Sequence, residues 1–139
     1  HAREGVFTMK IKKLVTNNPR VIEEVKNGEL GSDLNLVIEK CNDLDEVMTR
    51  SRDLIHKGYK LLTHPLAGSV KPAQNPYRSI ILAESEKDLD YFSLNIMEKA
   101  LDKLRQFQKT KKDIEYPESI LEDYQLIDHS LISSGIESL

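Results

Sequence analysis

The stretch LDEVMTRSRDLIHKGYKLLT, residues 44–63, joins the clearest helix signal of the chain to a strand. One helix face recurs at three- and four-residue spacing, formed by Leu44, Val47, Met48, Ser51, Leu54 and Ile55. Asp43 with Glu46 three residues later resembles a capping box, and Gly58 is typical of a helix end. Residues 59–63 then predict a strand. A helix that leads directly into a strand indicates the α/β class.

The same alternation extends from this stretch in both directions. Further strands are predicted over residues 11–16, 34–39 and 77–83, and further helices over 19–26, over 85–109 and from Pro117 onward. This order predicts one small α/β domain over residues 9–132, a three-layer sandwich with a mainly parallel sheet of about four strands and flanking helices. Right-handed crossovers make the first three strands parallel. The fourth strand lacks a crossover helix, so we expect it to run antiparallel at an edge.

The two ends of the chain fall outside that domain. Residues 1–8 precede Met9 and are interpreted as an upstream extension or a cloning remnant. Residues 133–139 are expected to form a frayed tail.

The two C-terminal helices carry apolar stripes that bear on association. In the first, the stripe contains Leu89, Phe92, Ile96, Ala100, Leu104 and Phe107, and it is widened by Leu94, Met97 and Leu101. In the last helix the inner side is predicted to contain Ile120, Leu121, Tyr124, Ile127 and Leu131. Since the wide stripe exceeds what one sheet face requires, we expect a homodimer with part of this face, or the last helix, at its contact.

Composition excludes several classes of protein. The 139 residues include 20 Lys and Arg against 23 Asp and Glu, a net charge of −3, which argues against a nucleic-acid partner. A single cysteine and scattered histidines give neither a disulfide framework nor a metal-ligand pair, so no metal site is expected. Residues 68–71, Gly-Ser-Val-Lys, lack the Walker order, and no cofactor is expected. There is no apolar run of roughly 20 residues and no signal peptide, so we expect a cytoplasmic protein without a membrane partner.

Polar residues follow two of the predicted strands at the points where they end. Thr16, Asn17 and Asn18 end the first strand, and Thr63 and His64 end the third. In open parallel α/β sheets ligands bind outside the carboxyl ends of the strands, so these residues are candidates for a shared site. The alternative is that Thr and Asn are here only as good turn and helix-cap residues.

The charge pattern favours an anion as the ligand. Between Asp53 and Glu84 lie 30 residues without a carboxylate, including a long loop from His64 to Pro76. Backbone N–H groups near Gly68 and the charges of nearby basic residues are the chemistry of an anion site. The predicted ligand-binding residues are Thr16, Asn17, Asn18, Thr63, His64, Ser69, Lys71 and Arg78.

Two further side chains are chemically suggestive. His64 is the candidate for proton transfer because an imidazole titrates near neutral pH, although a His before Pro more often has a structural hydrogen-bonding role. No nucleophile stands at a diagnostic spacing from it. Cys41 follows a strand near a helix start, where a thiolate is stabilised, but cysteine is also among the residues most often simply buried. We expect Cys41 to be dispensable.

Three segments resemble the GrdX family: Val15–Pro19, Ile55–Pro72 and Asn75–Ser79, which together span about the first two-thirds of the chain. Members of that family are small proteins encoded beside glycine reductase genes in anaerobic amino-acid-fermenting bacteria. The resemblance implies a genomic setting and no established activity. Glycine reductase is a thiol and selenol system with a carboxylate substrate and an acetyl phosphate product, a setting that an anion site suits.

Three functions therefore stay open. The first is a small cytoplasmic accessory protein of glycine reductase metabolism, with a pocket for a small anionic ligand formed by the loops after strands one and three. The second is an enzyme that uses His64 as general acid or base on a small carboxylate or phosphate. The third is a non-catalytic, homo-oligomeric assembly partner. The sequence does not decide whether the protein is an enzyme.

Overall fold

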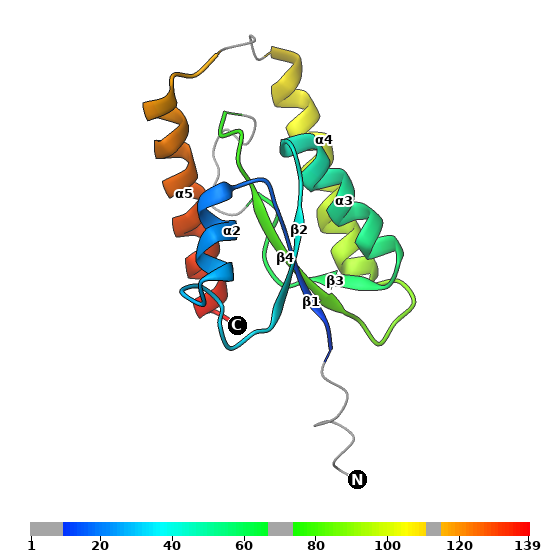
Figure 1. Ribbon diagram of the computed structural model, residues 1–139. Helices are drawn as coiled ribbons and strands as arrows, with labels where there is room; N and C mark the ends of the chain where they lie inside the picture. The colour runs from blue at the N-terminus through cyan, green and yellow to red at the C-terminus, as the bar shows by residue number, and fades with distance from the viewer. Residues whose placement is uncertain (1–9, 67–73, 111–114) are drawn as a thin grey trace.

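The computed structural model describes residues 10–66, 74–110 and 115–139, which form one mixed sheet with helices packed on both of its faces (Figure 1). The strands are β1 (Lys12–Thr16), β2 (Leu36–Lys40), β3 (Tyr59–Leu61) and β4 (Ser79–Glu84). The helices of the described residues are α2 (Pro19–Lys26), α3 (Leu44–His56), α4 (Tyr91–Thr110) and α5 (Glu118–Glu137). The predicted α/β class is confirmed.

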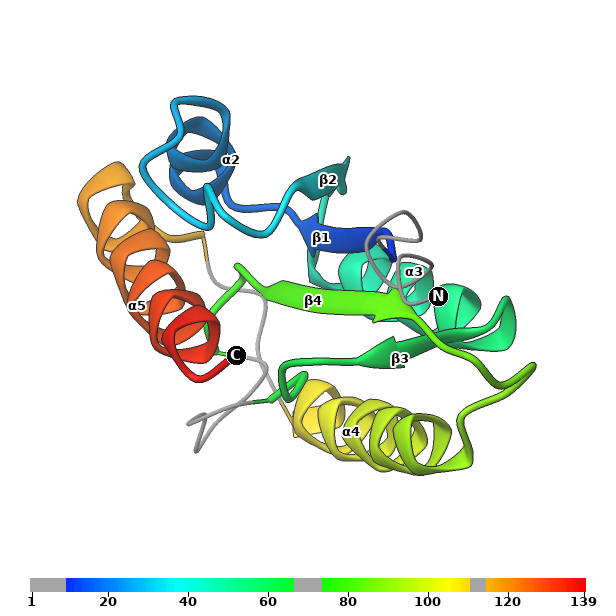
Figure 2. The same cartoon turned by 90° about the horizontal axis from the view of Figure 1, so that it is seen from below.

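The sheet has the order β2-β1-β4-β3, which Figure 2 shows from one end to the other. β1 pairs parallel with β2, whereas β4 pairs antiparallel with both β1 and β3. The first three strands therefore share one direction and β4 opposes them, as expected. The prediction of a mainly parallel sheet is wrong, however, because β4 is inserted between β1 and β3 and does not lie at an edge.

The burial of the strands explains this order. Ser79 through Ala83 of β4 are buried without interruption, as a strand covered on both faces must be. β2, in contrast, is an edge strand in which Val37 is half-exposed. It also begins two residues later than predicted, after Asn35, whose backbone φ of 52° lies outside the strand region.

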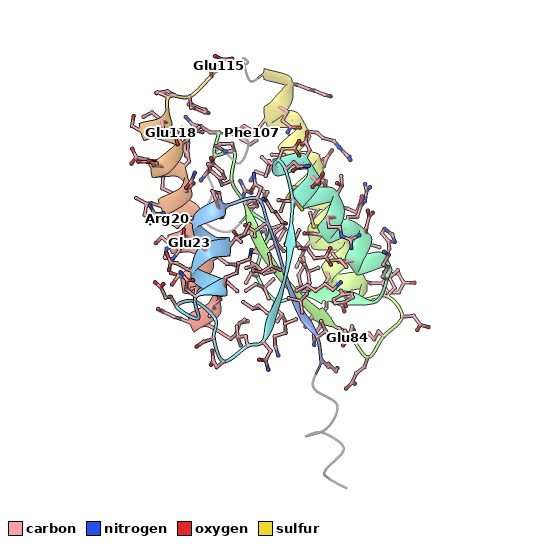
Figure 3. All side chains as sticks on the ribbon, viewed as in Figure 1. Arg20, Glu23, Glu84, Phe107, Glu115 and Glu118 are labelled. Atoms are coloured by element: carbon pink, nitrogen blue, oxygen red, sulfur yellow. The ribbon has the colours of Figure 1, made fainter. Side chains whose placement is uncertain are left out.

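Two apolar cores lie on opposite faces of the sheet. Val15, Ile80 and Leu82 face α3 and α4, and they pack with residues such as Met48 and Leu104. The neighbouring positions Leu14 and Ile81 face α2 and α5 and pack with Val21, Leu30 and Ile132. Figure 3 shows side chains from helices and strands meeting on both sides of the sheet. This alternation follows the two-residue period of β-strands.

The helix predicted over residues 85–109 begins at Tyr91 instead of Ser85. The carboxylate of Asp90 accepts hydrogen bonds from the backbone N–H and the hydroxyl of Ser93, at 3.3 and 2.6 Å, which stabilises the first turn. Phe92, placed on the inner stripe by the sequence, is 74% exposed. The buried face is instead formed by Ser93, Met97, Ala100, Leu101 and Leu104.

Because a different face of α4 is buried, the argument for a dimer contact on this helix no longer holds. Met97 and Leu101 are buried within the chain's own core, and Leu94 is partly buried against the same core. These were the residues that widened the predicted stripe. The homodimer itself stays a prediction, without the face first assigned to it.

The inner face of α5 also differs from the prediction. Ile120 and Ile127 are exposed, and Asp128 and Ile132 are buried in their place. The helix continues to Glu137, so it includes most of the residues 133–139 that were expected to fray. A carboxylate on the buried side of a helix requires hydrogen-bond partners. The partners of Asp128 lie at the candidate site.

Candidate functional site

A cavity of about 320 Å³ lies between the sheet edge where β3 ends and β4 begins and the C-terminal half of α5. One part of its wall is polar and consists of Thr63, His64, Arg78, Ser79 and Asp128. The other part is largely apolar and includes Leu62, Leu131, Ile132 and Gly135. Three of the predicted site residues, Thr63, His64 and Arg78, therefore line one cavity.

A chain of hydrogen bonds supports the polar wall from behind. The Asn18 backbone N–H donates to Thr16 Oγ1 at 3.0 Å, and Thr16 Oγ1 lies 2.7 Å from Ser79 Oγ. Ser79 Oγ donates to Asp128 Oδ2, also at 2.7 Å. Because the single hydroxyl proton of Ser79 is used on Asp128, the proton between Thr16 and Ser79 belongs to Thr16. The chain therefore has one direction and ends on the carboxylate.

Asp128 is the most deeply placed charged group of the cavity, with 3% of its surface exposed. Its Oδ2 accepts a second hydrogen bond from Asn18 Nδ2 at 3.0 Å. Burial raises the pKa of Asp128, while the bonds from Asn18 and Ser79 and the charge of Arg78 lower it in part. Both side-chain donors end on Oδ2, and a hydrogen bond from the Ser79 backbone N–H also lowers the pKa of this carboxyl.

Arg78 places a cation on the same wall, with 6% of its surface exposed. Its Nη1 donates to the Pro65 carbonyl oxygen at 2.9 Å, and its Nε donates to the Tyr77 carbonyl oxygen at 3.3 Å. Burial lowers the pKa of the guanidinium, and the Asp128 carboxylate raises it in part. The positive charge of Arg78, which lies in the carboxylate-free stretch, is thus compensated by Asp128 of α5, about 50 residues away in the sequence.

Asn17 fixes the backbone of Arg78 and does not line this cavity. Its Oδ1 accepts a bond from the Arg78 backbone N–H at 2.9 Å, and its Nδ2 donates to the Pro76 carbonyl at 2.8 Å. Asn18 caps α2, since its Oδ1 accepts from the Arg20 N–H at 3.0 Å. For Asn17 and Asn18 the turn-and-cap interpretation therefore describes the contacts, although both support the cavity wall.

His64 lies at the cavity with its side chain exposed to solvent. Its Nδ1 accepts a hydrogen bond from the Leu66 backbone N–H at 3.0 Å, which is the structural role common for a His before Pro. In the neutral ring this bond assigns the proton to Nε2. Thr63 is used similarly, because its Oγ1 accepts from the Ile81 N–H at 3.0 Å.

Thr16 and His64 lie at the same end of the sheet, but their strands are not neighbours. β4 runs between β1 and β3, and Ser79, its first residue, pairs with Thr16. Thr16 therefore acts behind the wall and not in it. Ser69 and Lys71 belong to residues 67–73, outside the described residues, so their position relative to the cavity stays a prediction.

Sequence reasoning missed Asp128 and Ser79. A signal existed for Asp128, because it stands at helical spacing between Leu121 and Ile132 on the buried side of α5. A carboxylate on such a stripe is a candidate for a buried functional group. Ser79 opens an apolar strand, and no pattern distinguishes it from an ordinary strand end.

Two further cavities lie near this end of the molecule. One, of about 360 Å³ between α2 and α5, is lined by Glu23, Glu24 and Glu29, and Figure 3 labels Glu23 beside Arg20 on α2. The other, of about 330 Å³, contains Asn17 together with Asp43 and Asp45 at the start of α3. Both have acidic linings, so neither suits an anion as well as the cavity with Arg78.

Cys41 is buried and does not line any of these cavities. Burial, together with the negative charges of Glu46 and Glu39, raises its pKa to about 11. The thiol is therefore protonated at neutral pH, which argues against the reactive-thiol hypothesis.

Within residues 10–66, 74–110 and 115–139 no three metal-ligating side chains form a cluster. In the same part of the chain, no helix combines the length and the apolar character needed to cross a membrane.

Comparison with family models matches residues 13–137 to the family described as GrdX-like protein. The match includes α5 and Asp128, which lie beyond the segments that carried the resemblance in the sequence. No curated protein and no solved structure matches the chain.

Proposed function

The chain belongs to the GrdX-like protein family, and on that premise we propose that it is an accessory protein of anaerobic amino-acid metabolism that binds a small anionic ligand. The proposed site is the cavity between the β3–β4 end of the sheet and α5, and the ligand is a carboxylate or a phosphate. The setting in glycine reductase metabolism follows the family resemblance.

The buried guanidinium of Arg78 is the observation that supports an anion. It lies on the cavity wall with little exposure to water, where a charge-assisted hydrogen bond is stronger than at the surface. Thr63 places a hydroxyl group on the same wall, and His64 Nε2 adds a donor at its exposed side. Ser69 and Lys71 are proposed to complete the site.

Titration of the full chain with inorganic phosphate, acetate and longer aliphatic carboxylates tests this function. An anion bound by Arg78 gains charge-assisted bonds of about 1.5–3 kcal/mol each, so Arg78→Lys should weaken binding by roughly tenfold to a hundredfold. Arg52→Lys on α3, which packs on the other face of the sheet, is the matched control. Absence of binding of every anion to the wild-type chain would reject the site.

His64 supports a second candidate, an enzyme acting on the same ligand. The bond from the Leu66 N–H to Nδ1 holds the ring in place, so that proton transfer to or from the ligand would take place at Nε2. His64→Ala should then abolish turnover while leaving ligand affinity within a few-fold of wild type. Unchanged turnover would reject the catalytic role.

A further inference from the structure

We infer that the ligand of the cavity carries a cationic hydrogen-bond donor beside its anionic group, as an α-amino acid with an apolar side chain does, and that Asp128 binds this donor. This inference rests on the proposed anion site and specifies the class of its ligand.

The bonding of Asp128 is the first observation. Both side-chain donors that reach it, from Asn18 and Ser79, end on Oδ2. No side-chain donor of the described residues reaches Oδ1, and the Asp128 side chain lines the cavity and is almost fully buried. An ammonium group in the cavity would add a charge-assisted hydrogen bond to this carboxylate.

The charges of the cavity wall are the second observation. Arg78 and Asp128 line the same cavity, and each favours the ionised form of the other: Asp128 raises the pKa of Arg78, and Arg78 lowers the pKa of Asp128. A ligand with only a negative charge would be attracted by Arg78 and repelled by Asp128. A zwitterion gains from both groups, because its carboxylate faces the guanidinium and its ammonium faces the carboxylate.

The apolar part of the wall indicates the side chain of the ligand. Leu62, Leu131 and Ile132 face the cavity beside Gly135, whose lack of a side chain lets α5 approach Thr63 closely. A volume of about 320 Å³ lies at the small end of the range for small-molecule sites. An aliphatic amino acid fits these surroundings better than a phosphate, which has no apolar part.

Three matched probes separate the contributions of the two charges. Leucine carries both, 4-methylpentanoate lacks the amino group, and 3-methylbutylamine lacks the carboxylate. Isothermal titration of the wild-type chain should show leucine binding at least about tenfold more tightly than either analogue, since one charge-assisted hydrogen bond is worth about one decade.

Asp128→Asn gives the residue-level test. Asparagine keeps the size of the side chain and an oxygen for Asn18 and Ser79 but removes the charge, so leucine should lose its advantage over 4-methylpentanoate. The affinity for 4-methylpentanoate should stay equal or rise, because the repulsion is gone. Asp123→Asn, on the exposed side of the same helix, is the control and should change neither affinity.

The outcomes distinguish this inference from the proposed function. If 4-methylpentanoate binds wild type as tightly as leucine, the anion site stands and the role of Asp128 is rejected. If 3-methylbutylamine binds as tightly as leucine, both are rejected. If none of the three probes binds, this inference is rejected, and the titrations with phosphate and acetate decide the anion site. The wild-type comparison needs no variant, so it decides even if Asp128→Asn fails to fold.

Discussion

Ser79 at the start of β4 donates a hydrogen bond to Asp128 on α5, with 2.7 Å between Oγ and Oδ2. The same carboxylate oxygen accepts from Asn18 at the start of α2, so one atom of α5 joins a strand and a second helix. This bond is also part of the cavity wall. The docking of α5 and the shape of the candidate site therefore depend on the same residues.

Asp128→Ala is expected to destabilise the protein. It leaves the buried Ser79 hydroxyl and the Asn18 amide without their acceptor, and such losses cost about 1–3 kcal/mol for each group. We expect the free energy of unfolding in urea to fall by roughly 2–4 kcal/mol, discounted for the relief of burying a charge. Asp123→Ala on the exposed side of α5 should change it by less than about 0.5 kcal/mol. Equal effects of the two substitutions would contradict the role of Asp128 as the attachment point of α5.

The free energy of unfolding should depend on pH through the titration of Asp128. Burial raises the pKa of Asp128 in the folded protein above the ordinary value of 3.8, which applies to the unfolded chain. Between the unfolded and the folded pKa, the native state therefore holds a proton that the unfolded chain releases. The contribution is fully present below the unfolded pKa and is lost as the pH rises through the folded pKa. Urea unfolding at several pH values between 4 and 8 should show wild type losing stability relative to Asp128→Asn as the pH rises. A difference that stays constant, or that grows in favour of wild type, would contradict the raised pKa.

The position of β4 shows how far local patterns predict this fold. Its direction followed from the missing crossover helix, and the direction was correct. Its place in the sheet depends on burial over both faces, and the uninterrupted apolar run Ile80–Ala83 carried that information. The charged and half-exposed residues of β2, such as Glu39 and Val37, mark an edge strand by the opposite pattern.

The candidate site was predictable in part for a related reason. Thr63, His64 and Arg78 belong to segments next to strand ends, so proximity in sequence to those ends placed them at the cavity. Asp128 comes from a helix that follows the whole sheet in sequence. Its position depends on how α5 packs, and a one-position error in the helix face moved the prediction to Ile127, which is exposed.

Cys41 should react slowly with thiol reagents in the native protein. With a pKa of about 11 instead of 9.0, its thiolate fraction at pH 8 is lower by about a hundredfold. Alkylation by iodoacetamide, followed by mass spectrometry, should therefore be at least about a hundredfold slower than for an unperturbed thiol. The urea-unfolded chain is the control and should react at the ordinary rate. Comparable rates in the two states would mean that the thiol is neither buried nor protonated as described.

Gly135 and Thr63 form the close contact between α5 and the end of β3. A Cβ atom added to Gly135 would lie 3.0 Å from Thr63 Cγ2, and the bond from the Ile81 N–H to Thr63 Oγ1 restrains that side chain. Gly→Ala in a helix normally stabilises by up to about 1 kcal/mol. We expect Gly135→Ala to bring no such gain, because Thr63 must shift to accommodate it.

Thr63→Ser supplies the matched background for this test, since it keeps the hydroxyl and removes the methyl group that Gly135→Ala would contact. In that background Gly135→Ala should stabilise by up to about 1 kcal/mol, so that the two substitutions show a coupling energy of the same order. Urea unfolding of the four proteins of the cycle measures this coupling. Because both residues line the cavity, equal gains in the two backgrounds would show that α5 lies further from β3 than described, and that the cavity is wider at this end.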